Sequence, residues 1–112
     1  MRHRPHHWRL EGHTPVPVPD DEVLAWAEWF QHADRTVVQE YIGPYFVSTV
    51  FLALDHNFSF TGPPILFETM VFGDGGGAVG NYQERCSTWD EALDMHQRGL
   101  IWAVAKVAVE SI

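Results

Sequence analysis

Six polar side chains are of types that could do chemistry together, and all of them border or interrupt apolar runs. They are Asp55, His56, Glu68, Thr69, Arg85 and His96. Burying a carboxylate without a partner is costly, so Glu68, which follows Phe67 and precedes Met70, needs an explanation. His96 is equally informative because its spacing places it on the apolar side of a helix. We therefore treat these six residues as candidate ligand-binding residues.

The residue types support three interpretations of this cluster. In the first, Glu68 pairs with Arg85 on an adjacent strand and His96 donates to a backbone carbonyl, which gives a satisfied polar network. In the second, Glu68, His96 and either His56 or Asp55 meet between a sheet and a helix and bind the polar edge of a small molecule. In the third, Asp55, His56, Glu68 and His96 form a small acid–base or metal-dependent hydrolase.

Metal and phosphate motifs are missing from the sequence. No HExxH, HxH or CxxC spacing is present, so we assign no metal and no cofactor to the cluster. The glycine-rich segment 73–80 precedes a strand-like run rather than a helix, and it contains no lysine. We therefore expect a hairpin loop there and not a phosphate-binding loop.

The elements that must position these residues follow from periodicity. Apolar residues at helical spacing predict an N-terminal helix capped by Asp20 or Asp21, and a long C-terminal helix opened by a capping box of Thr88 and Glu91. β-Branched and aromatic runs predict two hairpins, around Gly43–Pro44 and around 73–80. The expected fold is α+β, with a mostly antiparallel sheet of about four strands packed with both helices. Runs 47–54 and 65–72 are apolar on both faces, so helices or another subunit should cover both sides.

Length and composition limit the possible classes of protein. The 112 residues predict a single α+β domain over 20–112, preceded by an extended His/Pro-rich arm over 1–19. The formal charge of -8 argues against nucleic-acid binding. Cys86 is the single cysteine, which suits a reducing compartment, and no apolar run is long enough to span a membrane. We expect a cytoplasmic protein that contacts no membrane, and leave open whether the histidines of the arm bind metal.

The C-terminal helix carries apolar residues on a second face. Ile101, Trp102, Ala105 and Val109 lie off the stripe expected to meet the sheet. Such a two-faced helix on a small domain predicts a homo-oligomer, most simply a dimer, through this helix. Trp29 falls off the stripe of the N-terminal helix and should cover the arm or a partner.

Three sequence blocks, FVSTVFLALDHNF, PPILFETMVFG and ERCSTWDEALDMH, resemble a family of small bacteriophage and prophage proteins without an established activity. The resemblance covers roughly residues 15–98. Residues that match the family pattern are Trp26, Phe30, Arg35, Ser48, Thr49, Leu52, Asp55, His56, Phe67, Glu68, Thr69, Thr88, Ala92 and His96. Ala53 departs from it, where glycine is usual, as does Cys86, where an aromatic residue is common. The resemblance implies a phage accessory protein acting inside a bacterial host cell.

The leading functional hypothesis is a non-enzymatic phage accessory protein that binds a small ligand or a host protein. A nucleotide-derived host immune signal is one candidate ligand, which would make the protein an anti-defence factor. One alternative is the small hydrolase described above. A second is an interaction module that inhibits a host factor through Trp29, Ile101 and Trp102. The sequence leaves the ligand, the host partner and the oligomer size open.

Overall fold

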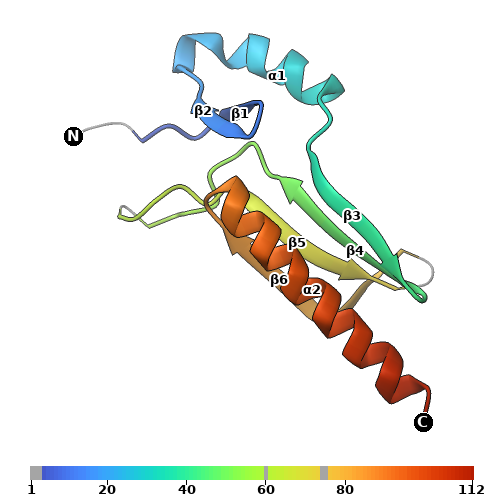
Figure 1. Ribbon diagram of the computed structural model, residues 1–112. Coiled ribbons are helices and arrows are strands. Elements are labelled where there is room, and N and C mark those ends of the chain that lie inside the picture. The colour runs from blue at the N-terminus through green and yellow to red at the C-terminus, as the bar shows by residue number, and fades with distance from the viewer. Residues whose placement is uncertain (1–3, 60, 74–75) are drawn as a thin grey trace.

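The computed structural model describes residues 4–59, 61–73 and 76–112, with 78–81 described by their backbone. Four strands form an antiparallel sheet in the order β3-β4-β5-β6, and a long helix, α2, contacts all four (Figure 1). The bounds are Thr36–Ile42 for β3, Tyr45–Phe51 for β4, Phe67–Phe72 for β5, Ala78–Cys86 for β6 and Trp89–Glu110 for α2. This confirms the predicted α+β class with its four-stranded sheet and long C-terminal helix.

The N-terminal segment folds onto one end of the sheet. β1 (Trp8–Glu11) and β2 (Thr14–Pro17) form a hairpin, followed by a 3-10 turn η1 (Asp20–Glu22) and helix α1 (Val23–His32). The Trp8 amide donates to the Ala53 carbonyl at 2.9 Å, and the Asp55 amide donates to the His6 carbonyl at 2.9 Å. The segment expected as an extended arm thus contains a β-hairpin that is docked on the end of the sheet; residues 1–3 lie outside the described residues.

Local sequence signals explain where several elements begin and end. Gly43 has a φ of 56° in the turn between β3 and β4, a conformation that glycine adopts without strain. Thr88 and Glu91 form the predicted capping box at the start of α2. The predicted aspartate cap of α1 is wrong: Glu22 occupies the cap position without a side-chain bond, because Asp20 and Asp21 lie in the preceding 3-10 turn. The second hairpin connection is shorter than 73–80, and its Asp74 and Gly75 lie outside the described residues.

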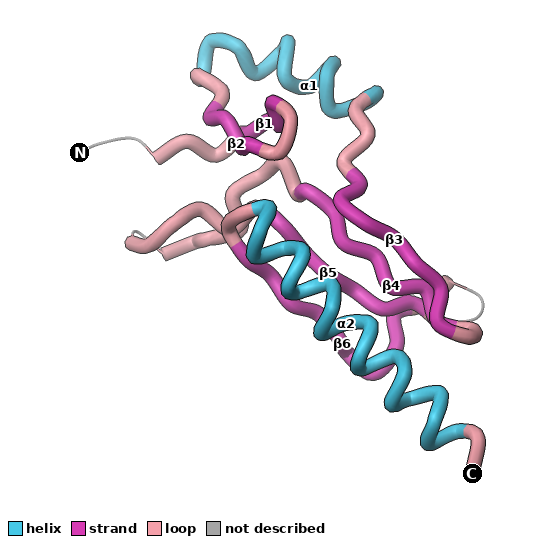
Figure 2. The backbone as a smooth tube through the Cα atoms, in the orientation of Figure 1, coloured by secondary structure: helices cyan, strands magenta, loops and turns pink. Residues whose placement is uncertain are grey.

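Strand alternation divides the sheet into two different faces. Side chains at odd positions in β4 and β5, such as Val47, Phe51 and Phe67, are buried against α2. The opposite face is what we call the open face: within the described residues no helix packs on it (Figure 2). Its apolar members are Tyr41, Phe46, Val50, Met70 and Phe72, and its polar members are Gln39, Ser48, Glu68, Gln83 and Arg85. Cover was expected on both faces; α2 provides it on one, and within the described residues no helix provides it on the other.

Two apolar clusters make the core beneath α2. The first contains Phe51, Phe67 and Met95, and Trp29 packs against it together with Trp8 from the arm. The second contains Val47, Val71 and Ala103, with Tyr45 and Trp102 at its edge. Trp102 therefore faces the sheet, which corrects the prediction that it lies on an outward face. Leu93 and Val104 of α2 lie away from this core and are 42% and 53% exposed.

Candidate functional site

His96 is the centre of a buried chain of hydrogen bonds that joins α2 to three strands. Its side chain is 1% exposed. Nε2 lies 2.9 Å from Oε1 of Glu40 on β3, and Nδ1 lies 2.7 Å from Oγ1 of Thr49 on β4. The Thr49 hydroxyl lies 2.5 Å from that of Thr69 on β5. We call these four residues the His96 relay.

The chemistry of the partners fixes the direction of the hydrogen bonds. An ionised carboxylate accepts and cannot donate, so Nε2 of His96 carries the hydrogen that Glu40 accepts. In the neutral imidazole, Nδ1 then accepts from Thr49, whose oxygen accepts from Thr69. In a protonated imidazole both hydroxyls turn around, and Nδ1 donates to Thr49. With a neutral imidazole every hydrogen of the relay therefore has an acceptor within it, whereas the reversed chain leaves the Thr69 hydrogen without an acceptor in the relay.

The relay has the group types of a catalytic triad, a carboxylate, an imidazole and a hydroxyl, but not its accessibility. A nucleophilic hydroxyl must reach a substrate atom. The side chains of Thr49 and Thr69 are both 0% exposed, while Glu40 is 46% exposed. Solvent therefore meets the carboxylate end, whereas the hydroxyl end is sealed beneath α2. This arrangement can fix the helix on the sheet but cannot present a nucleophile.

Glu68 and Arg85 lie on the opposite face of the sheet from His96. Oε2 of Glu68 accepts from Nε of Arg85 at 2.8 Å and from Nε2 of Gln83 at 2.7 Å. The predicted meeting of Glu68 with His96 is therefore wrong, because Phe67, Thr69 and Val71 take the α2 side and alternation sends Glu68 to the open face. The Glu68–Arg85 pair of the first interpretation is confirmed. Its prediction for His96 is wrong, since the partners are side chains rather than a backbone carbonyl.

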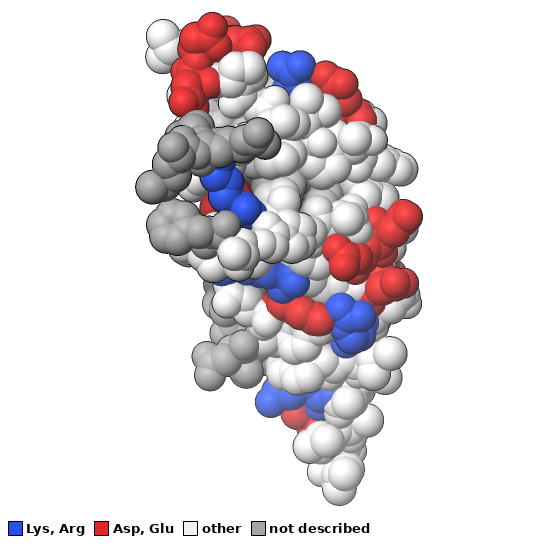
Figure 3. Space-filling model, turned by 90° about the vertical axis from the view of Figure 1, so that its left-hand side faces the viewer, with Lys and Arg blue, Asp and Glu red and all other residues white. Residues whose placement is uncertain are grey.

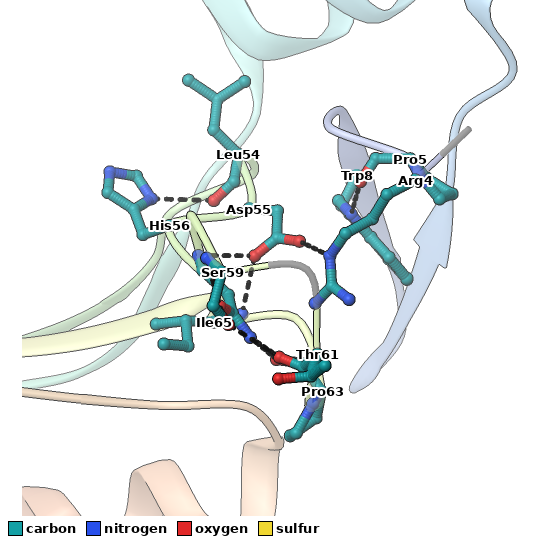
Figure 4. Close-up of polar contacts among 11 residues, drawn as sticks. Arg4, Pro5, Trp8, Leu54, Asp55, His56, Ser59, Thr61, Pro63 and Ile65 are labelled. Atoms are coloured by element: carbon teal, nitrogen blue, oxygen red, sulfur yellow. Dashed lines mark hydrogen bonds and ion pairs between the residues drawn. The ribbon is translucent and has the colours of Figure 1, made fainter. Parts of the chain in front are cut away.

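Asp55 and His56 belong to a third location, beside the N-terminal segment (Figure 4). The Asp55 side chain is 3% exposed. Its Oδ1 accepts from the amides of Asn57 at 2.7 Å and Ile65 at 2.9 Å, and its Oδ2 accepts from Nε of Arg4 at 2.9 Å. Nδ1 of His56 donates to the carbonyl of Leu54 at 2.8 Å. Asp55 thus clamps the arm and loop 57–65 to the end of β4.

Burial and hydrogen bonding act in opposite directions on the Asp55 carboxyl. Desolvation raises its pKa, but the amides of Asn57 and Ile65 and the guanidinium of Arg4 favour the ionised form. The net result is a pKa below the ordinary value of 3.8. Burial also raises the pKa of the Cys86 thiol, to about 11, which leaves it protonated and unreactive at neutral pH.

The six predicted site residues therefore fall into three separate groups, with Thr69 and His96 sharing the relay. Sequence reasoning missed Glu40 and Thr49. A usable signal existed for both, since a two-residue turn at Gly43–Pro44 pairs Glu40 with Val47, and alternation then places Glu40, Val47 and Thr49 on one face. Sequence reasoning did not apply the strand register that this two-residue turn sets, and so it did not place Glu40 and Thr49 beside His96.

The part of the chain that the structure describes forms no cluster of metal ligands, and the cavity between its arm and α1 is small. No three His, Cys, Asp or Glu side chains converge there to hold a metal ion. A cavity of about 100 Å³ lies between the arm and α1, lined by Arg9, Val18, Glu22, Ala25, Trp26 and Trp29. Pockets for drug-sized ligands typically have about 300–1,000 Å³. This cavity is too small for a nucleotide.

Ala53, two residues before Asp55, has a φ of 65°, in the left-handed region that favours glycine. A comparison with protein-family models, with curated proteins and with solved structures finds no match to this chain. Among the described helices, none combines the length and the apolar character needed to cross a bilayer.

Proposed function

We propose that this chain is a non-enzymatic accessory protein that binds a basic protein partner through the open face of its sheet. The observation that carries the proposal is an apolar sheet face that no described element covers. Tyr41, Phe46 and Phe72 form a row across β3, β4 and β5, and the Tyr41 and Phe46 ring centroids are 4.8 Å apart. Tyr41 is 72% exposed. Aromatic residues and Met are the residue types enriched at protein interfaces.

The polar residues of the open face suit a protein partner. Gln39 donates to Ser48 at 2.8 Å, and the Glu68 carboxylate is neutralised by Arg85 and also accepts a hydrogen bond from Gln83. The face therefore carries no net charge, and its polar groups are already paired before a partner arrives. A partner does not have to neutralise an unpaired charge in order to cover the aromatic row, which lowers the cost of desolvation.

The basic residues argue against a phosphate-rich ligand. Of the described Lys and Arg side chains, those of Arg4, Arg9, Arg85, Arg98 and Lys106 pair with carboxylates. Arg35 donates to the Phe51 carbonyl and stacks over Phe30. On the side seen in Figure 3, basic atoms lie beside acidic atoms rather than in a patch of their own. Recognition of a nucleotide-derived signal would require several free cationic groups at one point.

The partner's charge follows from that of the chain. A formal charge of -8 attracts basic proteins and repels acidic ones over a distance of about one Debye length. Because the open face itself is neutral, this field would speed the encounter while the aromatic row supplies the contact. The setting implied by the family resemblance makes a host protein of an infected bacterium the natural partner.

Retention of bacterial proteins on the immobilised full-length chain tests the proposal. We expect wild type to retain a basic host protein at low salt, and Tyr41→Glu to weaken its binding at least tenfold. Leu24→Glu is the matched control, because Leu24 is 88% exposed on α1 and away from the open face. Equal retention of the partner by both variants, or no protein retained by wild type, would contradict the proposal.

A further inference from the structure

We infer that two copies of this chain associate through the outer side of α2, antiparallel and related by a twofold axis. The outer side of the last three turns of α2 and the residues that follow is apolar. Ile101, Val104, Val109 and Ile112 are 68%, 53%, 67% and 106% exposed. Ala105 and Ala108 are also exposed and lie between them. We call these six residues the outer stripe.

The outer stripe reads the same in both directions. Its residues in chain order are Ile, Val, Ala, Ala, Val and Ile, at positions 101, 104, 105, 108, 109 and 112. In a twofold interface, if residue i contacts residue j of the second copy, residue j also contacts residue i. An antiparallel pairing that sets Ile101 opposite Ile112 also sets Val104 opposite Val109 and Ala105 opposite Ala108. Every side chain then meets one of its own kind, with the small alanines nearest the axis.

Charge determines which pairing is favourable. Asp90 and Asp94 continue the same helical side towards the N-terminal end of α2, and both are exposed. A parallel pairing would set each aspartate near its copy, whereas the antiparallel pairing leaves all of them beyond the contact. Lys106 and Glu110 point away from the stripe, where they pair with each other and Glu110 also bonds Tyr45. Antiparallel helix dipoles add a further small preference.

A second copy explains the palindrome, which an unrelated partner would not require. The stripe covers 12 residues, of which the 10 in α2 span roughly 15 Å of helix at 1.5 Å per residue. A standard interface buries about 800 Å² per partner, so one stripe of this length gives a modest, concentration-dependent dimer. This inference does not rest on the proposed function, because α2 and the open face lie on opposite sides of the sheet (Figure 2).

Sedimentation equilibrium of the full chain tests the association. We expect the mass to rise from 12.8 kDa towards twice that value as the concentration increases from micromolar to millimolar. Val104→Glu should raise the dissociation constant at least tenfold, while Leu24→Glu leaves it unchanged. A wild-type chain that stays monomeric at millimolar concentration would overturn the inference, as would equal dimerisation of the Val104→Glu variant.

Cysteine cross-linking tests the antiparallel register, and it does not depend on how Val104→Glu folds. In a Cys86→Ser background, a mixture of Val104→Cys and Val109→Cys chains should form a mixed disulfide rapidly. Ile101→Cys alone is the control, because in this register the two copies of residue 101 lie about 16 Å apart along the axis at 1.5 Å per residue. Rapid disulfide formation by Ile101→Cys alone would indicate a parallel pairing and overturn the inference.

Discussion

The imidazole of His96 has a side-chain partner on each ring nitrogen, and these partners come from different strands. Its position depends on Glu40 and Thr49, and Thr49 depends in turn on Thr69. Each intact buried hydrogen bond contributes modestly to the free energy of unfolding. Removing one partner is more costly, because the other partner then stays buried without a hydrogen bond. The relay is therefore more important for holding α2 in one position than the number of its hydrogen bonds suggests.

Thr49→Val tests this role with little change in side-chain shape. The substitution removes the hydroxyl and leaves both Nδ1 of His96 and Oγ1 of Thr69 without their buried partner. We expect the free energy of unfolding to fall by about 1–3 kcal/mol, measured by urea denaturation. Ser48→Ala is the neighbouring control, since its partner Gln39 is exposed and can turn to water. Equal losses for the two variants would contradict a special role for the relay.

Asp55 gives the pH dependence of stability a specific source. Its pKa is lowered in the folded chain, so its contribution is fully present above the unfolded value of 3.8 and is lost as pH falls through the folded value. Asp55→Asn keeps an oxygen for the amide bonds but loses the charge that Arg4 pairs with. We expect this variant to be less stable than wild type by about 1–2 kcal/mol at pH 7.

The same variant should respond differently to acid. As pH falls below 3.8 and then through the lower folded pKa of Asp55, wild type protonates this carboxyl and loses its contribution, whereas the side-chain amide of the Asp55→Asn variant cannot titrate, so the two stability curves converge. Thermal unfolding from pH 2 to pH 7 measures the gap in stability between wild type and the Asp55→Asn variant. A gap that stays constant down to pH 2 would show that the ionised carboxylate is not what stabilises the loop.

At the scale of elements, the close approach of α2 to the sheet depends on Gly99. A Cβ at this position would lie 3.0 Å from Cγ2 of Thr69 and 3.0 Å from Cγ1 of Val47, so these two buried methyl groups would have to give by a few tenths of an ångström. The absence of a side chain at Gly99 therefore lets α2 pack closely on β4 and β5. A helix that can shift outward would also lengthen the bonds of the His96 relay.

Gly99→Ala should therefore destabilise the chain despite the better helix propensity of alanine. Overpacking costs typically 1–3 kcal/mol, whereas the propensity gain is about 1 kcal/mol, so we expect a net loss of up to about 2 kcal/mol. Gly77→Ala is the control, since nothing lies within 4 Å of a Cβ there. Urea denaturation compares the two variants, and a stabilised Gly99→Ala chain would rule out tight packing.

Most elements could be predicted from sequence because their signals are local. The capping box at Thr88 and the turn at Gly43 each specify their own boundary. The site could not be predicted in this way, because tertiary packing and not a local signal determines which face of the sheet α2 covers. The apolar pattern of β5 fits either face, with Phe67 and Val71 on one and Met70 and Phe72 on the other. Choosing the wrong face moved Glu68 to the wrong side.

At the scale of the whole molecule, the two proposed contact surfaces lie on opposite sides of one sheet. A dimer formed through the outer stripe of α2 would leave both open faces exposed and directed away from the twofold axis. Each dimer would then present two equivalent surfaces to its partner. Two linked sites bind a dense array of partners far more tightly than either site alone, because the second contact is intramolecular.

Dissociation from an immobilised partner tests this bivalency. Wild type should leave a densely coated surface at least tenfold more slowly than Val104→Glu, because both of its open faces can bind at once. On a sparsely coated surface the second face finds no partner, so the two rates should be equal there. Tyr41→Glu should bind weakly at either density because its contact surface is damaged. Equal rates for wild type and Val104→Glu on the dense surface would mean that the dimer cannot engage both faces, even if each proposed contact is correct alone.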